Sequence, residues 1–136
     1  MKIISLDFGE KYIGVAFADT DSVLIAQPIE IVKNKGDGKE LDSISEILKK
    51  KKAELVVLGY PRNLSGHATQ QTREVEAFGD RLKSTLGLPL KYQDETLSSV
   101  VVKDQLSEDK KGHKKRIDDQ AAALILQDYL EQEFRR

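Results

Sequence analysis

Three strand-like apolar runs open the chain with no helix between them. They cover residues 2–8, 12–18 and 23–32, and the short segment Gly9-Glu10-Lys11 between the first two predicts a hairpin. Pro28 lies in the third run, where it marks an edge strand, a bend or a bulge, because proline cannot donate to a strand ladder. Helices and strands then alternate along the chain. We therefore expect an α/β fold with a mixed central sheet and helices on both faces.

The rest of the chain supplies this alternation. Leu41, Ile44, Ile47 and Leu48 recur at helical spacing and predict a helix over 39–51. The further elements expected in order are a strand over 53–59, a helix over 68–86, a strand over 88–93, a helix over 96–107, a charged loop over 107–116 and a closing helix over 117–134. With 136 residues and no visible linker, we expect one domain that spans residues 1–136.

Composition excludes several classes of protein. The chain has no cysteine, so it has neither a disulfide framework nor a thiolate zinc site. No apolar run reaches the length of a membrane span, and no signal peptide is visible, so we expect a cytoplasmic protein without a membrane partner. The 22 basic and 23 acidic residues give a net charge of −1. A surface that binds phosphates must therefore be local.

Carboxylates occupy positions where an apolar core is expected. Asp7 ends the apolar run that contains Ile3, Ile4 and Leu6, and a buried carboxylate is costly unless it is paired, hydrogen-bonded or bound to a metal. On a helical wheel of residues 117–130, Asp118 falls in the middle of the apolar arc and Asp119 near its edge. A helix N-cap is the simpler explanation of this acidic pair, and Asp119 suits it better than Asp118.

A further acidic pair, Asp94 and Glu95, lies where a short strand gives way to a helix. Helix capping would explain this pair alone. If Asp7, Asp94, Glu95 and Asp118 converge, however, their oxygens form a site suited to Mg²⁺ or Mn²⁺. Two such ions are a standard device for hydrolysing phosphodiester bonds. The sequence thus predicts catalytic roles for Asp7, Glu95 and Asp118, and metal binding by these three together with Asp94.

Basic residues near these acids are candidates for contacts with nucleic acid. Five of them lie within seven residues just before Asp118, and they read equally well as a solvated loop or as a clamp on phosphates. Arg62 and Asn63 follow the strand over 53–59, and Lys11 lies in the predicted hairpin. The full candidate set is Lys11, Arg62, Asn63, Lys110, Lys111, Lys114, Lys115 and Arg116.

Four segments together resemble the YqgF/RuvX family. They are DFGEKYIGVAFAD, VVLGYPRNLSG, YQDETLSS and IDDQAAALILQDYL, which occur in that order across essentially the whole chain. The resemblance implies a ribonuclease H-like fold, related to the RuvC Holliday-junction resolvases, and an enzyme that matures the 5′ end of pre-16S ribosomal RNA. It also implies that Asp7, the pair Asp94 and Glu95, and Asp118 are the family's acidic residues, whereas Asp119 lies outside the pattern.

One departure from the family pattern leaves alternatives open. Thr96 stands where the family commonly has arginine, and threonine cannot make the bidentate contacts of a guanidinium group. Besides a nuclease that acts on structured RNA, the alternatives are a Holliday-junction-type DNA endonuclease and a non-catalytic protein that binds nucleic acid or the ribosome. A kinase-type or actin-type ATPase would need a second domain and a second D-x-G motif. A monomer and a homodimer are both compatible with the sequence.

Overall fold

The computed structural model describes residues 1–61, 70–94 and 114–134, with side chains in the last segment from Gln120 onward. One sheet has the strand order β3-β2-β1-β4-β5. Its strands are β1 (Lys2–Phe8), β2 (Tyr12–Asp19), β3 (Val23–Lys33), β4 (Leu55–Tyr60) and β5 (Leu90–Asp94). Strands β1, β4 and β5 run parallel, and β2 runs antiparallel to both of its neighbours. The carboxyl ends of β1, β4 and β5 therefore meet at one edge of the sheet.

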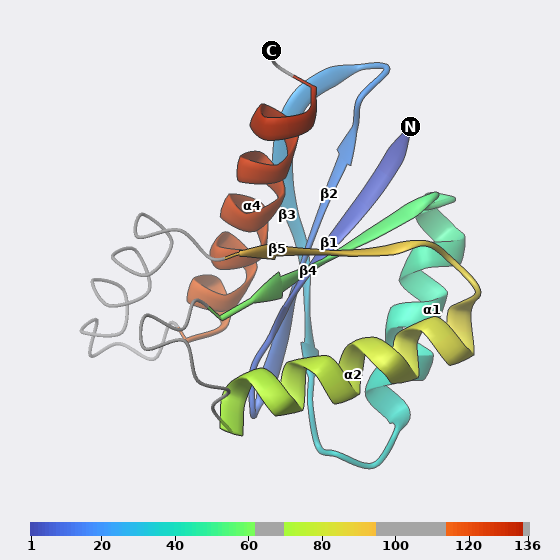
Figure 1. Ribbon diagram of the computed structural model, residues 1–136, viewed down its shortest axis with the longest axis vertical. Coiled ribbons are helices and arrows are strands. Elements are labelled where there is room, and N and C mark those ends of the chain that lie inside the picture. Colours follow the sequence, from blue (N-terminus) through green and yellow to red (C-terminus); the bar gives the residue numbers. More distant parts are fainter. Residues whose placement is uncertain (62–69, 95–113, 135–136) are drawn as a thin grey trace.

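Helices cover both faces of this sheet, as predicted. Helices α1 (Lys39–Lys51) and α2 (Gln70–Leu86) lie on one face, and α4 (Lys114–Glu133) crosses the other (Figure 1). The alternation of side chains along β1 produces the two cores. Ile4 and Leu6 pack toward α1 and α2, whereas Ile3 packs toward α4.

Most predicted element bounds agree with the structure. The strand over 2–8 and the helix over 39–51 are confirmed exactly, and the other described strands and α2 differ by one or two residues at their ends. The predicted helix over 96–107 lies outside the described residues, and so does the part of the predicted charged loop at 107–113.

The start of the last helix is a correction. Helix α4 begins at Lys114, so Lys114, Lys115 and Arg116 form its first turn and not the end of a charged loop. Lysine and arginine are good helix formers, and no glycine or proline separates them from the apolar face that follows. Asp118 and Asp119 are consequently the fifth and sixth residues of the helix. The interpretation of this pair as an N-cap is wrong.

The third strand is an edge strand with a bulge near Pro28, as the proline predicted. Strand β3 lies at the edge of the sheet. Glu30 pairs with Val15 but Pro28 pairs with Ala16, so β3 carries an extra residue at this point. An edge strand with such an irregularity tolerates proline, because the missing N–H falls outside the regular ladder.

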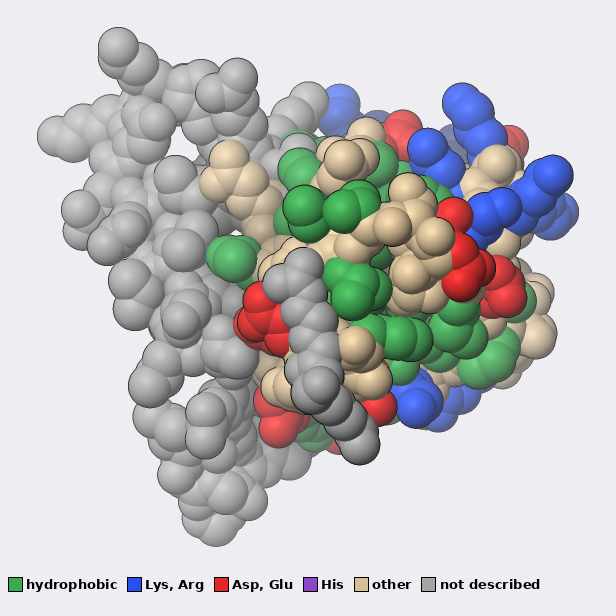
Figure 2. Space-filling model, turned by 90° about the horizontal axis from the view of Figure 1, so that it is seen from above, with side chains coloured by type: hydrophobic (Ala, Val, Ile, Leu, Met, Phe, Trp, Pro, Cys, Tyr) green, Lys and Arg blue, Asp and Glu red, His purple; other side chains and the backbone are tan. Residues whose placement is uncertain are grey.

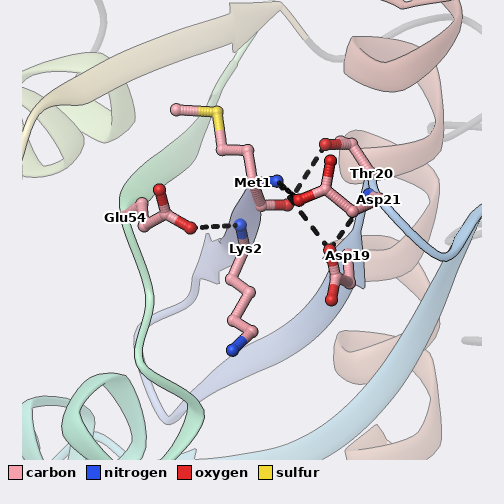
Figure 3. A network of polar contacts seen from close by, with 6 residues as sticks. All are labelled: Met1, Lys2, Asp19, Thr20, Asp21 and Glu54. Atoms are coloured by element: carbon pink, nitrogen blue, oxygen red, sulfur yellow. Dashed lines mark hydrogen bonds and ion pairs between the residues drawn. The ribbon is translucent and has the colours of Figure 1, made fainter.

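The beginning of β1 is held by polar contacts from two other segments (Figure 3). The amino group of Met1 donates to Asp21 Oδ2 at 2.8 Å, in the turn between β2 and β3, and this hydrogen bond raises the pKa of the amino group. The backbone N–H of Lys2 donates to Glu54 Oε1 at 3.1 Å, just before β4. These contacts fix the end of the sheet opposite to the carboxyl ends of β1, β4 and β5.

No helix in the described part of the chain is long and apolar enough to cross a membrane.

Candidate active site

Asp7 is the central residue of the candidate site. It is the second-last residue of β1, is only 4% exposed, and lies opposite Gly14 of β2. Alternation along β1 puts Asp7 on the same face as Ile3 and Ser5, which is the face covered by α4. Asp7 is thus buried near the end of a core strand, as the sequence predicted, and it lies on the face that α4 covers.

A buried hydrogen bond aligns α4 with β1. The hydroxyl of Ser5 donates to the backbone carbonyl of Ala122 at 2.7 Å. Helix α4 runs in the opposite direction to β1 (Figure 1). Two residues along β1 from Ser5 advance about 6.6 Å. One helical turn back from Ala122 covers a similar distance, about 5.4 Å. Position 118 of the helix backbone therefore lies level with Asp7.

The helical phase of α4 separates positions 118 and 119. Position 118 shares a face with Ala121, Ala122 and Ile125, all of which are buried against the sheet. Position 119 is rotated by about 100° from it, toward the half-buried Ala123. The side chains of Asp118 and Asp119 lie outside the described part of the structure.

The ends of β4 and β5 complete the edge of the sheet beside Asp7. Leu6 pairs with Leu58, so Asp7 is level with Gly59, and Gly59 pairs in turn with Gln93. Gln93 is buried, at 7% exposed, on the face of Asp7. Asp94, the next residue, pairs with Tyr60 on the opposite face and is exposed. Glu95 lies outside the described residues.

Tyr60 brings a second polar group to this edge that the sequence reasoning missed. Its hydroxyl donates to Glu76 Oε1 of α2 at 2.6 Å. This hydrogen bond to a carboxylate is the main cause that raises the pKa of Tyr60 above 10.0, with smaller contributions from desolvation and from the charges of Glu76, Tyr92 and Asp94. The ring packs edge-on against Tyr92, with centroids 5.5 Å apart. No local signal identifies this contact, because it depends on which helix covers β4.

The hairpin after Asp7 is closed tightly. A Cβ atom at Gly9 would lie 2.6 Å from the carbonyl oxygen of Tyr12, so only glycine fits there. Asn34 then fixes the hairpin from the end of β3. Its side-chain amide donates to the carbonyl of Gly9 and its backbone N–H donates to that of Lys11, both at 2.8 Å. Lys11 is exposed at the same edge of the sheet as Asp7.

The other predicted nucleic-acid contacts are only partly described. Arg62, Asn63, Lys110 and Lys111 lie outside the described residues. The backbone of Lys114, Lys115 and Arg116 forms the first turn of α4, one turn before position 118. The structure thus places three predicted basic positions and Lys11 near the edge that holds Asp7.

The structure describes only part of the predicted metal site. Asp7 supplies a buried carboxylate, and carboxylate oxygens are the usual ligands of Mg²⁺ and Mn²⁺. Among the side chains that the structure describes, no three of His, Cys, Asp and Glu form a metal-sized cluster. Of the predicted ligands, only Asp7 and Asp94 have described side chains.

Known proteins resemble this chain over nearly its whole length. The family model for RuvX, described as a Holliday junction resolvase, matches residues 1–132. A "Putative pre-16S rRNA nuclease" from Caldanaerobacter subterraneus subsp. tengcongensis is 38% identical over 96% of each chain. Another protein of that name, from Streptococcus thermophilus, is 37% identical over 98% of this chain and 100% of its own.

Solved structures show which fold this is. Thermus thermophilus RuvC, in complex with a Holliday junction substrate, superposes with a TM-score of 0.56 over 98% of this chain and 96% of its own, at 15% identity. The fowlpox virus Holliday junction resolvase superposes with a TM-score of 0.54 at 20% identity, over 97% of this chain and 99% of its own. The fold is ribonuclease H-like, as the sequence predicted. From the extent of the sequence matches, the chain belongs to the RuvX family.

Proposed function

We propose that this protein is a metal-dependent nuclease that hydrolyses phosphodiester bonds in structured RNA, in the maturation of the 5′ end of pre-16S ribosomal RNA. The observation that carries this proposal is the buried carboxylate of Asp7, which lies under α4 at the edge where β1, β4 and β5 end. The relatives named as pre-16S rRNA nucleases support the choice of substrate. A cytoplasmic location goes with this substrate.

The proposed metal ligands are Asp7, Glu95 and Asp118. Position 118 is level with Asp7 on the buried face of α4. Glu95 is the second residue along the sequence after Gln93, and Gln93 lies on the face of Asp7. Asp94 lies on the opposite face, beside Tyr60, so we assign it an outer role that tunes the site by its charge. Bound Mg²⁺ or Mn²⁺ would supply the activated water and neutralise charge on the phosphate.

The protein groups around these acids would bind and orient the nucleic acid. Lys11 and the first turn of α4 offer positive charge near Asp7, and Arg62, Asn63, Lys110 and Lys111 extend the set in the sequence. Contacts to phosphates position a substrate without reading its sequence. Recognition of a precursor would then rest on the shape of the RNA.

A DNA junction is the second candidate substrate. The family model carries the description Holliday junction resolvase, and the fold is that of RuvC. Both substrates present phosphates to the same carboxylates. Thr96, which replaces the family's common arginine, motivates a third outcome in which the protein binds nucleic acid without cleaving it.

The deciding experiment compares two substrates side by side. A pre-16S rRNA fragment and a four-way DNA junction are incubated with the wild type in Mg²⁺, Mn²⁺ or EDTA. We expect cleavage of the RNA with either metal and none with EDTA. Asp7→Asn should reduce the rate by more than about a hundredfold, because it removes a ligand charge. Asp42→Asn, an exposed change on α1, is the matched control and should cleave normally.

Each alternative has its own result in this experiment. Cleavage of the DNA junction but not of the RNA would identify the protein as a DNA endonuclease. Cleavage that persists in EDTA would contradict the dependence on metal. Binding of RNA without cleavage in either metal would make the protein a binding module.

A further inference from the structure

The strongest positive charge in the described part of the chain lies far from Asp7. Lys49, Lys50, Lys51 and Lys52 follow one another at the end of α1, and we call them the α1 lysine cluster. Lys49, Lys50 and Lys52 are exposed, while Lys51 lies over the ring of Phe17 with its Nζ 5.2 Å from the centroid. Figure 2, seen from above relative to Figure 1, shows Lys and Arg side chains gathered at its right-hand end, on the side where α1 ends and β4 begins.

The backbone at this cluster carries a lysine where glycine would fit better. Lys52 has φ 55° and ψ 44°, and it is the only non-glycine residue with positive φ in the described segments. This left-handed conformation is less favourable for an L-residue than for glycine. The neighbouring helix α2 meets the same need with Gly87, at φ 65°. The chain thus keeps a lysine side chain at position 52 at a cost in stability.

The charges of the cluster are not neutralised within the described structure. No described carboxylate forms an ion pair with any of the four lysines. The next acidic residue along the chain, Glu54, accepts a hydrogen bond from the backbone N–H of Lys2. Unpaired lysines on one surface repel each other, and an external anion would relieve this repulsion.

Compensation of the helix dipole does not require so many lysines. Cations near a helix C-terminus stabilise the helix only modestly, and the effect is confined to the last turn. Helix α2 ends beside α1 and has a single basic residue, Lys83, in its last turn. Helix α1 has three there, followed by Lys52. The excess charge at α1 therefore needs another explanation.

The chemistry of the surface favours phosphates over a protein or a lipid. Lys49 and Lys52 flank a groove of about 280 Å³ between the ends of α1 and α2, which also includes the hydroxyl-bearing residues Ser45 and Thr85. The rest of its lining is apolar and buried or half-buried, and consists of Leu48, Ala53, Leu86 and Leu88. None of the large apolar side chains exposed in the described structure belongs to α1 or to this groove. Protein interfaces and membrane-bound helices both rely on such apolar anchors. Exposed lysines around a groove without an exposed apolar anchor suit a polyanion that is bound without sequence specificity.

We infer that the α1 lysine cluster is a second contact surface for the phosphate backbone of the RNA, separate from the catalytic edge. This inference rests on the proposed function and extends it. Strand β4 links the two surfaces, because Leu55 follows the cluster and Tyr60 ends beside the candidate site. Its six residues span about 17 Å. A nucleic acid that touches both surfaces must have at least that reach.

Salt titrations of binding test this inference. Two RNAs are used in Ca²⁺ to prevent cleavage: a duplex of about 16 base pairs, a length that a protein domain can span, and a dinucleotide, which is too short to reach from one surface to the other. Each phosphate contact contributes about 0.9 to the slope of log affinity against log salt for a duplex. For Lys49→Gln/Lys50→Gln/Lys52→Gly we expect the slope for the duplex to fall by roughly 1–2 and that for the short RNA to stay unchanged.

Two further variants separate charge from structure. Lys49→Arg/Lys50→Arg/Lys52→Arg keeps the charge and should bind both RNAs like the wild type. Lys52→Gly alone should raise the thermal midpoint by about 3–6 °C and still weaken binding of the duplex. If Lys52 had a structural role instead, Lys52→Gly would lower both the thermal midpoint and the affinity for the duplex.

The results that overturn the inference differ from those that overturn the proposed function. An unchanged slope for the duplex in the triple variant, or an equal loss for both RNAs, would exclude a separate surface at α1. Cleavage by the wild type in Mg²⁺ is measured on the same duplex-containing RNA. If the slope falls as expected but no cleavage occurs, the second surface stands and the nuclease assignment fails.

Discussion

At the scale of single residues, Asp7 shows how a chain can keep a carboxylate inside its core. Strand alternation assigns it to the α4 face, where Gly14 of β2 lies opposite it and Gly59 of β4 lies level with it. The two neighbouring strands thus place no side chain beside the carboxylate at this level of the sheet.

Asp118 and Asp119 provide a matched pair of neighbouring carboxylates. Position 118 lies on the buried face of α4 and position 119 at its margin. Asp118→Asn should abolish cleavage. Asp119→Asn should retain it, with stability changed by less than about 0.5 kcal/mol because the helix begins a turn earlier and needs no cap there. Cleavage rates and thermal midpoints of both variants check this. Equal loss of activity in the two would show that the helical phase is misassigned.

The Tyr60–Glu76 hydrogen bond makes a prediction about pH. The Glu76 carboxylate raises the pKa of Tyr60, so the folded state favours the protonated phenol. The resulting stabilisation is fully present below the ordinary tyrosine pKa and is lost as pH rises through the raised value. In Glu76→Gln, one tyrosine should ionise at lower pH than in the wild type, as followed by ultraviolet absorbance. Tyr60→Phe identifies that step by removing it, and identical titrations of Glu76→Gln and wild type would refute the assignment.

At the scale of elements, a helix with a periodic apolar pattern was predictable throughout, whereas a helical turn without that pattern was not. Ile44 and Leu48 repeat at helical spacing and set α1 exactly. The run Lys114, Lys115 and Arg116 has no such period, and its composition suits a loop as well as a helical turn, so α4 was expected to begin three residues late. Likewise, Asp7 could be singled out locally as a buried acid. The proximity of Asp7 to Gln93 and Tyr60 could not be predicted, because it depends on the strand order β1-β4-β5.

The first turn of α4 carries charge of the unfavourable sign. Cations at a helix N-terminus oppose the macrodipole by about 0.3–1 kcal/mol each at low salt. Lys114→Gln/Lys115→Gln/Arg116→Gln should therefore keep or raise the thermal midpoint. If the three side chains contact phosphates, the slope of log affinity against log salt should meanwhile fall by about 1–2 for RNA. Lys114→Arg/Lys115→Arg/Arg116→Lys keeps the charge and should match the wild type. A lower midpoint with unchanged slope would make these residues structural.

At the scale of the whole molecule, one sheet separates two hydrophobic cores, and the candidate site adjoins the core on the α4 face alone. The core toward α1 and α2 contains Phe78 and Leu82, whereas the core toward α4 contains Ile125 and Leu126. Asp7 adjoins the second core. A change in charge at Asp7 should therefore act on the docking of α4 and leave the first core intact.

Divalent metal should stabilise the folded protein through this site. A ligand that binds only the folded state at about 100 times its Kd adds about 2.7 kcal/mol, which corresponds to roughly 10 °C for a chain of this size. We expect Mg²⁺ to raise the thermal midpoint of the wild type and of Asp42→Asn but not that of Asp7→Asn. Without metal, Asp7→Asn should be at least as stable as the wild type, because like charges are removed. NaCl at equal ionic strength controls for screening, and equal shifts in all three proteins would contradict a site at Asp7.

The bond from Ser5 to Ala122 joins residues 117 positions apart and has a consequence for biosynthesis. While the nascent chain leaves the ribosome, Ile3, Val57 and their neighbours on that face of the sheet have no cover until residues 114–133 follow. The same late segment brings Asp118. A partly made chain would therefore lack both the last layer of its fold and its full set of proposed ligands.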